Sequence, residues 1–139
     1  SANTALTQFS CHTNQLTGNI PGLSANPVLT HFSCHNNQLT GSIPSLSANT
    51  ALTVFYCGTN QLTGWSGGTV SATLGDFQAQ NNLLMQAAVD AILAAFVAAG
   101  RTTGTRILNL GGTGNAAPSA AGLADKATLQ SRGWTVTTN

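Results

Sequence analysis

The sequence predicts an α/β solenoid, in which short parallel strands stack on one another and a helical segment forms the C-terminal end. Two observations lead to this prediction. Nearly identical segments begin at Ser1, Ser24 and Ser47, 23 residues apart, and helix-like and strand-like stretches alternate over the last third of the chain. A unit of this length cannot bury its own apolar side chains, so consecutive units are expected to stack.

The repeated segments are SANTALTQFSCHTNQLTGNIPGL, SANPVLTHFSCHNNQLTGSIPSL and SANTALTVFYCGTNQLTG. A fourth, degraded copy is expected after them. Its apolar and asparagine positions repeat the spacing of Leu52, Phe55, Cys57, Asn60 and Leu62, and they are Leu74, Phe77, Ala79, Asn82 and Leu84.

Alternation within each repeat predicts a strand with one buried face. Phe9 and Cys11 are two residues apart and should point inward, whereas Ser10 between them points outward. Asn14 ends the strand, where its amide can bond backbone groups of its own turn and of the turns above and below. We predict an inward column of small apolar side chains, with a disulfide or a reactive or metal-binding thiol as the weaker alternatives, made of Cys11, Cys34, Cys57, Ala79, Leu110 and Val136.

The pattern L-T-x-F-x-C-x-x-N-Q-L-T-G-x-I-P-x-L resembles leucine-rich repeats, and its L-T-G-x-I-P part is similar to the plant-type subclass. The resemblance covers residues 1–84, which we expect to form about four turns. It departs from the family in having Phe and Cys at two positions usually held by Leu. The resemblance implies a solenoid whose parallel strands line a concave face.

The remaining residues, 85–139, are expected to continue the sheet and to complete a single structural domain. We predict a helix over residues 82–99 ended by Gly100, a strand over 106–110, a helix over 119–132 between Ser119 and Gly133, and a strand over 134–137. Leu108/Leu110 and Trp134/Val136 repeat the inward spacing of Phe9/Cys11. This end resembles the N-L-G-G-T-G-N-A-A-P-S…G-W-T-V segment after repeats in some bacterial surface and phage proteins, which implies that it covers the end of the solenoid.

The first of these helices is apolar nearly all round, with Gln86 and Asp90 as its polar exceptions. A helix lying on one surface needs only one apolar stripe. We therefore expect the solenoid and the second helix to enclose it, with packing on another subunit as the alternative. Residues 83–99 are too short and too polar in the middle to predict a membrane span.

Charge is unusually scarce. Only 5% of residues are charged, against about 25% in ordinary globular proteins. The first 75 residues have no formal charge, and the charged residues are Asp76, Asp90, Arg101, Arg106, Asp125, Lys126 and Arg132. Such a surface does not neutralise phosphates, so nucleic acid and acidic lipid are poor partners, and self-association is favoured by the lack of repulsion.

The outward strand positions form a neutral face that offers hydrogen bonds. We predict that His12 and His35 stack there in adjacent turns, with His31 on the same face. A metal site and a passive polar surface are alternatives to ligand contact, and we expect neither a metal nor a cofactor. The candidate ligand-binding residues are Gln8, Ser10, His12, His31, Ser33, His35, Tyr56, Asp76 and Gln78.

Two catalytic interpretations have little support. Ser33, His31 and Asp76 can be assembled into a triad on paper, but no segment resembles an oxyanion hole or a nucleophile elbow. Residues 111–114, G-G-T-G, lack the lysine of a phosphate-binding loop and predict a tight turn. We expect no enzymatic activity and no catalytic residues.

These observations predict a non-enzymatic recognition or adhesion module that binds a neutral polar ligand, a glycan or a protein, on its strand face. The alternative is a structural subunit of a repetitive assembly such as a fibre, a sheath or a virion decoration. Either protein would be exported, extracellular, on the cell surface or in a virion, and a homo-oligomer or part of a larger assembly. The chain starts inside a repeat and without Met, so we expect a processed product or an excerpt.

Overall fold

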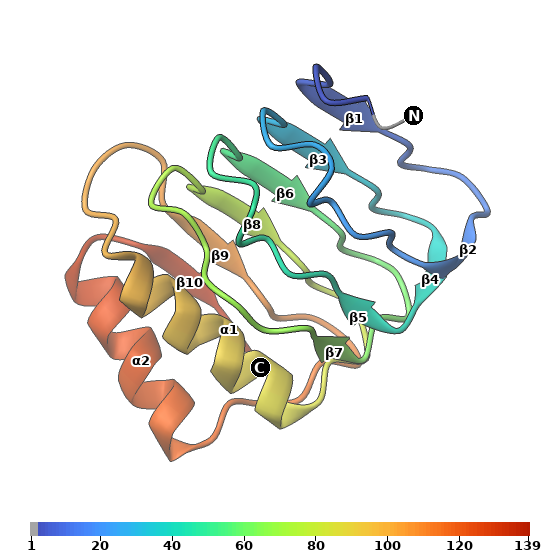
Figure 1. Ribbon diagram of the computed structural model, residues 1–139. Helices are drawn as coiled ribbons and strands as arrows, with labels where there is room; N and C mark the ends of the chain where they lie inside the picture. Colours follow the sequence, from blue (N-terminus) through green and yellow to red (C-terminus); the bar gives the residue numbers. More distant parts are fainter. Residues whose placement is uncertain (1–2) are drawn as a thin grey trace.

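The computed structural model describes residues 3–139, which form a parallel β-solenoid with two helices (Figure 1). The start of the first repeat, residues 1–2, lies outside the described residues. One parallel sheet runs the length of the molecule, in the order β1-β3-β6-β8-β9-β10. Its strands are β1 (Gln8–Ser10), β3 (His31–Ser33), β6 (Val54–Tyr56), β8 (Asp76–Gln78), β9 (Ile107–Asn109) and β10 (Thr135–Thr137). The predicted stack of parallel strands is confirmed.

Four further strands, each of two or three residues, lie on the other side of the turns, where the chain runs back (Figure 1). They pair as β2 with β4 and as β5 with β7. Their bounds are β2 (Thr17–Asn19), β4 (Gln38–Thr40), β5 (Ser42–Ile43) and β7 (Gly64–Trp65). The register of the long sheet confirms the degraded fourth copy, because Phe77 of β8 lies beside Phe55 of β6.

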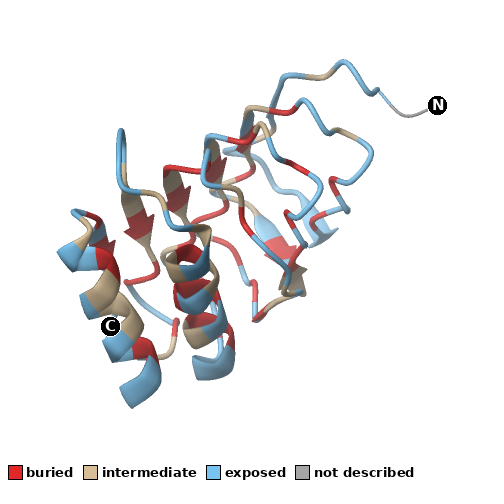
Figure 2. Cartoon of the chain, turned by 60° about the vertical axis from the view of Figure 1, so that its left-hand side comes forward, coloured by how far each residue is buried: buried red, intermediate tan, exposed pale blue. Residues whose placement is uncertain are grey.

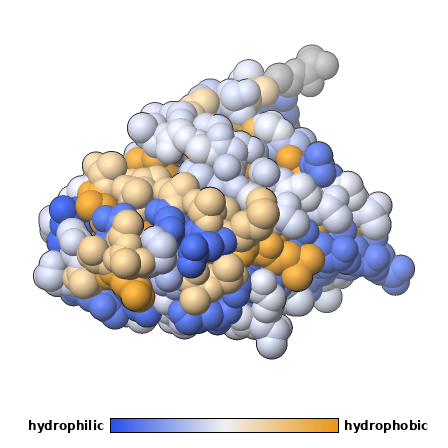
Figure 3. Space-filling model, turned by 90° about the horizontal axis from the view of Figure 1, so that it is seen from below, coloured by the Kyte–Doolittle hydropathy of each residue, from blue (hydrophilic) through white to orange (hydrophobic). Residues whose placement is uncertain are grey.

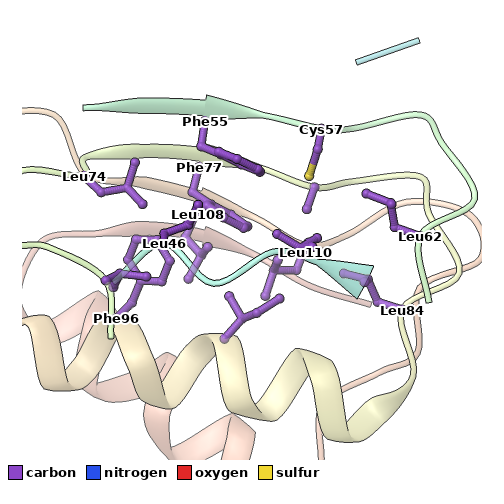
Figure 4. Close-up of a cluster of buried hydrophobic side chains, with 14 of the residues drawn as sticks. Leu46, Phe55, Cys57, Leu62, Leu74, Phe77, Leu84, Phe96, Leu108 and Leu110 are labelled. Carbon is purple, nitrogen blue, oxygen red and sulfur yellow. The ribbon is translucent and has the colours of Figure 1, made fainter. Parts of the chain in front are cut away.

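Inward side chains of successive strands form one continuous apolar core (Figure 4). Figure 2 marks the buried residues in red, among them residues of the long sheet and of the first helix. Phe9, Phe32, Phe55 and Phe77 stack in a single column, with ring centroids 5.2 to 5.6 Å apart. Burial increases along this column, since Phe9 is 42% exposed and Phe55 and Phe77 are fully buried. The phenylalanine at this repeated position therefore adds ring stacking to apolar burial.

After β3, β6 and β8, an asparagine bonds its own turn to the preceding one. In the third turn, Asn60 Oδ1 accepts the backbone N–H of Leu39 at 2.9 Å, and its Nδ2 donates to the carbonyls of Cys34 and Cys57, both at 3.1 Å. Asn37 and Asn82 make the equivalent bonds in the adjacent turns. These contacts confirm the predicted bonds within the turn and to one neighbouring turn, but among residues 3–139 the amides bond only the preceding turn and not the following one.

The first helix, α1 (Gln86–Ala99), begins later than the predicted residue 82, because Asn82 is held in this asparagine ladder. Gly100 ends the helix in the left-handed conformation, as predicted. The large apolar side chains of α1 are enclosed, and its exposed positions include a stripe of alanines: Ala87, Ala91, Ala94 and Ala98. The apolar composition of the helix therefore needs no second subunit to explain it.

The second helix, α2 (Ala120–Ser131), packs beside α1 and β10 (Figure 1). Ser119 is its N-cap, and its hydroxyl accepts the N–H of Gly122. The Asp90 carboxylate of α1 accepts the N–H of Ser119 at 2.9 Å, which joins the two helices at their start. The helices lie beside the last turns, on the side opposite the long sheet, and the strands that follow them extend that sheet.

One register prediction was wrong. Val136 of β10 pairs with Leu108 of β9, so it continues the phenylalanine column and not the cysteine column. Trp134 precedes the strand because it fills a different space: its ring packs edge-on against Phe96 at 5.2 Å, and its indole N–H bonds the carbonyl of Arg101. The cysteine column continues through Ala79 and Leu110, as predicted, and both are fully buried.

Candidate functional site

The candidate site is the outward face of β1, β3, β6 and β8, where outward side chains of successive strands form columns. One column contains Gln8, His31, Val54 and Asp76, which are paired across the four strands. The next contains Ser10, Ser33, Tyr56 and Gln78. Inward phenylalanines hold these strands in register, so the neighbours on the outer face follow from the core.

Two stacked imidazoles lie just beyond the C-terminal ends of β1 and β3 on this face. The rings of His12 and His35 are 4.5 Å apart and nearly parallel, as the repeat predicted. Ser33 Oγ is 2.8 Å from Nδ1 of His35, and the ring of Tyr56 meets His35 edge-on at 6.2 Å. Partial burial, together with the nearby His12, lowers the pKa of His35, so its ring is kept neutral near pH 7.

A second group of side chains surrounds the only charge on these four strands. The hydroxyl of Tyr56 donates to Oδ2 of Asp76 at 2.6 Å, and Nε2 of Gln78 donates to Oδ1 at 3.0 Å. Burial, followed by the bond to Asp76 and its negative charge, raises the pKa of Tyr56 to about 12. Both carboxylate oxygens are therefore bonded within the site, and Tyr56 stays a neutral donor.

Two hollows lie on the face, and His35 and Tyr56 line both of them. The first has a volume of about 280 Å³ and contacts the outer residues of β1 and β3, among them Gln8, Ser10 and His31. The second has a volume of about 220 Å³ and is lined by His35, Tyr56, Gly58, Gln78 and Gln80. Apart from Asp76, whose carboxylate is bonded to Tyr56, every predicted ligand-binding residue lines one of the two hollows.

Gly58 and Gln80 were not among the predicted site residues. Gly58 follows His12 and His35 in the same column, so the missing side chain was visible in the repeat alignment. The position of the Gln80 amide could not be inferred from spacing, because it depends on the side-chain rotamer.

The structure does not assemble the catalytic triad considered from the sequence. Ser33 bonds His35 and not His31, whose Nδ1 lies 2.9 Å from the hydroxyl of Thr30. Asp76 is bonded to Tyr56 and Gln78. Within residues 3–139, no three His, Cys, Asp or Glu side chains come together as a metal site would require.

The cysteines are free thiols in the inward column, with Cys34 and Cys57 buried and Cys11 partly exposed. Burial, with a smaller contribution from Cys11, raises the pKa of Cys34 to about 12, and burial raises that of Cys57 well above its usual value. Thiolates are the reactive form, so these positions are unsuited to nucleophilic chemistry.

This burial predicts how the native protein reacts with a thiol reagent at pH 8. We expect at most one of the three thiols, Cys11, to be labelled by an aromatic disulfide reagent before urea is added, and all three afterwards. The Cys11→Ser variant should abolish the native reaction. Rapid native labelling of Cys57 would contradict the stacked arrangement.

No family model matches the chain, and no curated protein is similar enough to it to be matched. In the part of the chain that the structure describes, neither helix has the length and apolar character needed to cross a membrane.

Proposed function

We propose that this chain is a leucine-rich-repeat solenoid whose last turns are helical, and that it acts as a non-enzymatic recognition or adhesion module. It binds a neutral polar ligand on the outer face of β1, β3, β6 and β8. The near absence of charge, combined with a surface of amides, hydroxyls and imidazoles, supports a place outside the cell, on a cell surface or in a virion, where it would form part of a tail fibre or a surface protein.

The observation that carries this proposal is the convergence of polar side chains around the two hollows. His35 and Tyr56 present rings to both hollows, and Gln78 adds an amide to the second. Aromatic surface beside a few fixed polar groups is the usual composition of a ligand site. A strand face that binds no ligand would also be polar because it is exposed to water. Exposure to water alone, however, does not account for hollows lined by stacked rings.

A second candidate function, a structural subunit of a repetitive assembly, is supported by the scarcity of formal charge. Residues 1–75 carry no Asp, Glu, Lys or Arg, so copies of the chain would repel one another little.

The test compares His35→Ala and Tyr56→Ala with the unaltered protein on arrays of immobilised neutral glycans and secreted proteins. We expect both variants to lose binding by about tenfold or more, because each removes a ring from both hollows. Gln38→Ala, an exposed position on β4 on the other side of the turn, is the matched control and should bind normally. Circular dichroism melts establish that all three variants are folded.

Unchanged binding in both ring variants would exclude this face as the site. The assembly function would then be favoured if light scattering showed ordered oligomers, whereas a strict monomer would count against it.

A further inference from the structure

The side-chain column formed by His12, His35, Gly58 and Gln80 is interrupted at its third position. One face of the His35 ring is covered by His12, at 4.5 Å. The opposite face is directed toward the next turn, where Gly58 has no side chain to cover it. The second hollow lies at this point, bounded by His35 on one side and Gln80 on the other.

The amide of Gln80 folds over the space that Gly58 leaves. A Cβ atom at position 58 would lie 2.8 Å from Cδ of Gln80. Oε1 of Gln80 is buried and has no hydrogen-bond partner among the described residues. A buried acceptor without a donor costs about 1–3 kcal/mol, so a ligand hydroxyl that reaches this amide would be favoured.

The remaining groups around the hollow select for a neutral ligand. Gln78 and Gln80 each offer amide donors and acceptors, and Tyr56 offers an aromatic ring. The nearest carboxylate, that of Asp76, is already bonded through both oxygens to Tyr56 and Gln78. No residue lining this hollow carries a formal charge when His35 is neutral.

We propose that the hollow beside Gly58 binds one ring of a neutral hexopyranose, with the C–H face of the sugar on His35 and its hydroxyls on the amides of Gln78 and Gln80. This inference rests on the proposed recognition function and specifies its ligand as a glycan. The polarised C–H groups on one face of a pyranose complement the electron-rich face of an aromatic ring. The neutral state of His35, favoured by its lowered pKa, preserves that property.

The size of the hollow agrees with a single sugar ring. Its volume of about 220 Å³ is below the roughly 300–1,000 Å³ of sites that enclose a whole drug-sized ligand. An aromatic side chain from a protein ligand would stack on His35 equally well, but it would leave the two amides without partners. The glycan is therefore the favoured occupant, and a peptide is an outcome that the experiment must be able to detect.

The experiment uses methyl glycosides of glucose, galactose, mannose and N-acetylglucosamine, with sialic acid and phenylalanine amide as charged and aromatic comparisons. Saturation-transfer NMR detects binding, and titration gives the dissociation constants. We expect at least one neutral glycoside to bind, with the saturation strongest on the protons of one ring face. Sialic acid and phenylalanine amide should bind at least about tenfold more weakly.

Two substitutions test the position of the site. Gly58→Val should abolish glycoside binding, and it should fold because the three atoms nearest to a Cβ atom at position 58 all belong to the flexible end of Gln80. Gln80→Ala, which opens the hollow and removes one bonding group, should weaken binding about fivefold. Gly22→Val is the matched control: a Cβ atom there meets nothing within 4 Å, and binding should be unchanged.

Glycoside binding that survives Gly58→Val, or stronger binding of phenylalanine amide than of every glycoside, would overturn the sugar assignment. In either case, loss of array binding in the His35 and Tyr56 variants would leave the proposed recognition function standing. If no glycoside binds and the ring variants also bind their array ligands normally, both proposals fail together.

Discussion

Replacing Phe77 by alanine is expected to lower the free energy of unfolding by about 3–5 kcal/mol. Phe77 is fully buried and joins three parts of the fold. Its ring stacks on Phe55 at 5.4 Å and meets Phe96 of α1 and Trp65 of β7 edge-on, at 5.4 and 6.4 Å. Alanine would remove these contacts and leave a cavity between the sheet, β7 and α1. Figure 4 shows Phe77 between Phe55 and Phe96.

Urea unfolding followed by circular dichroism measures this loss. Phe9→Ala is the matched control, because it makes the same change in the same column at a side chain that is 42% exposed and stacks on one ring only among the described residues, that of Phe32. Its expected cost is about 1 kcal/mol. Equal losses for the two variants would show that the phenylalanine column is not buried progressively toward the helices.

The alternation of inward and outward residues could be predicted because the repeat is nearly exact. A two-residue alternation decides which side chains share a face, and a constant period places like residues beside one another. The stacking of His12 on His35 and the burial of Cys34 and Cys57 follow directly from these two properties.

The repeat pattern predicted equivalent residues less accurately where the 23-residue period changes. The ladder continues at Asn115, whose Oδ1 accepts the N–H of Leu84 and whose Nδ2 donates to the carbonyl of Leu110. Asn115 lies five residues after Leu110, whereas Asn60 lies three after Cys57. The extra residues fall within the glycine-rich segment 111–114, which makes a turn as predicted but conceals the asparagine from any alignment at the repeat period.

The side-chain hydrogen bonds of the site also could not be predicted from the spacing of residues in the sequence. Pairing across strands places Tyr56 beside Gln78, but the bond from Tyr56 to Asp76 depends on side-chain rotamers. At the exposed face, burial does not restrict the rotamers as it does in the core. The surface of the helical end also lacks a simple pattern, because apolar and hydrophilic side chains are interspersed there (Figure 3).

Replacing Asn60 by alanine is expected to destabilise the protein by at least about 3 kcal/mol. The substitution leaves the buried N–H of Leu39 without its acceptor. It also removes one of the two amide donors to each of the carbonyls of Cys34 and Cys57, which keep the bonds from Asn37 and Asn82. These groups are buried between two turns, where water does not replace the amide. Thermal and urea unfolding of the variant measure the loss.

The first turn provides the control. Asn14 is exposed, and its Nδ2 bonds only the carbonyls of Cys11 and His12 within its own turn, so Asn14→Ala should cost about 1 kcal/mol or less. A comparable loss at both positions would mean that the bonds between turns contribute nothing beyond the bonds within each turn.

Asn60→Asp separates the loss of hydrogen bonding from the loss of volume, since aspartate is nearly the same size as asparagine. An ionised carboxylate at this buried position can accept from Leu39 but cannot donate to the two carbonyls, so its folded-state pKa should be raised above the unfolded value of about 3.9. The folded protein then holds the proton more tightly, and the destabilisation should grow as the pH rises above about 4. A loss of stability independent of pH between 4 and 7 would contradict the role of Asn60 as a buried donor that joins adjacent turns.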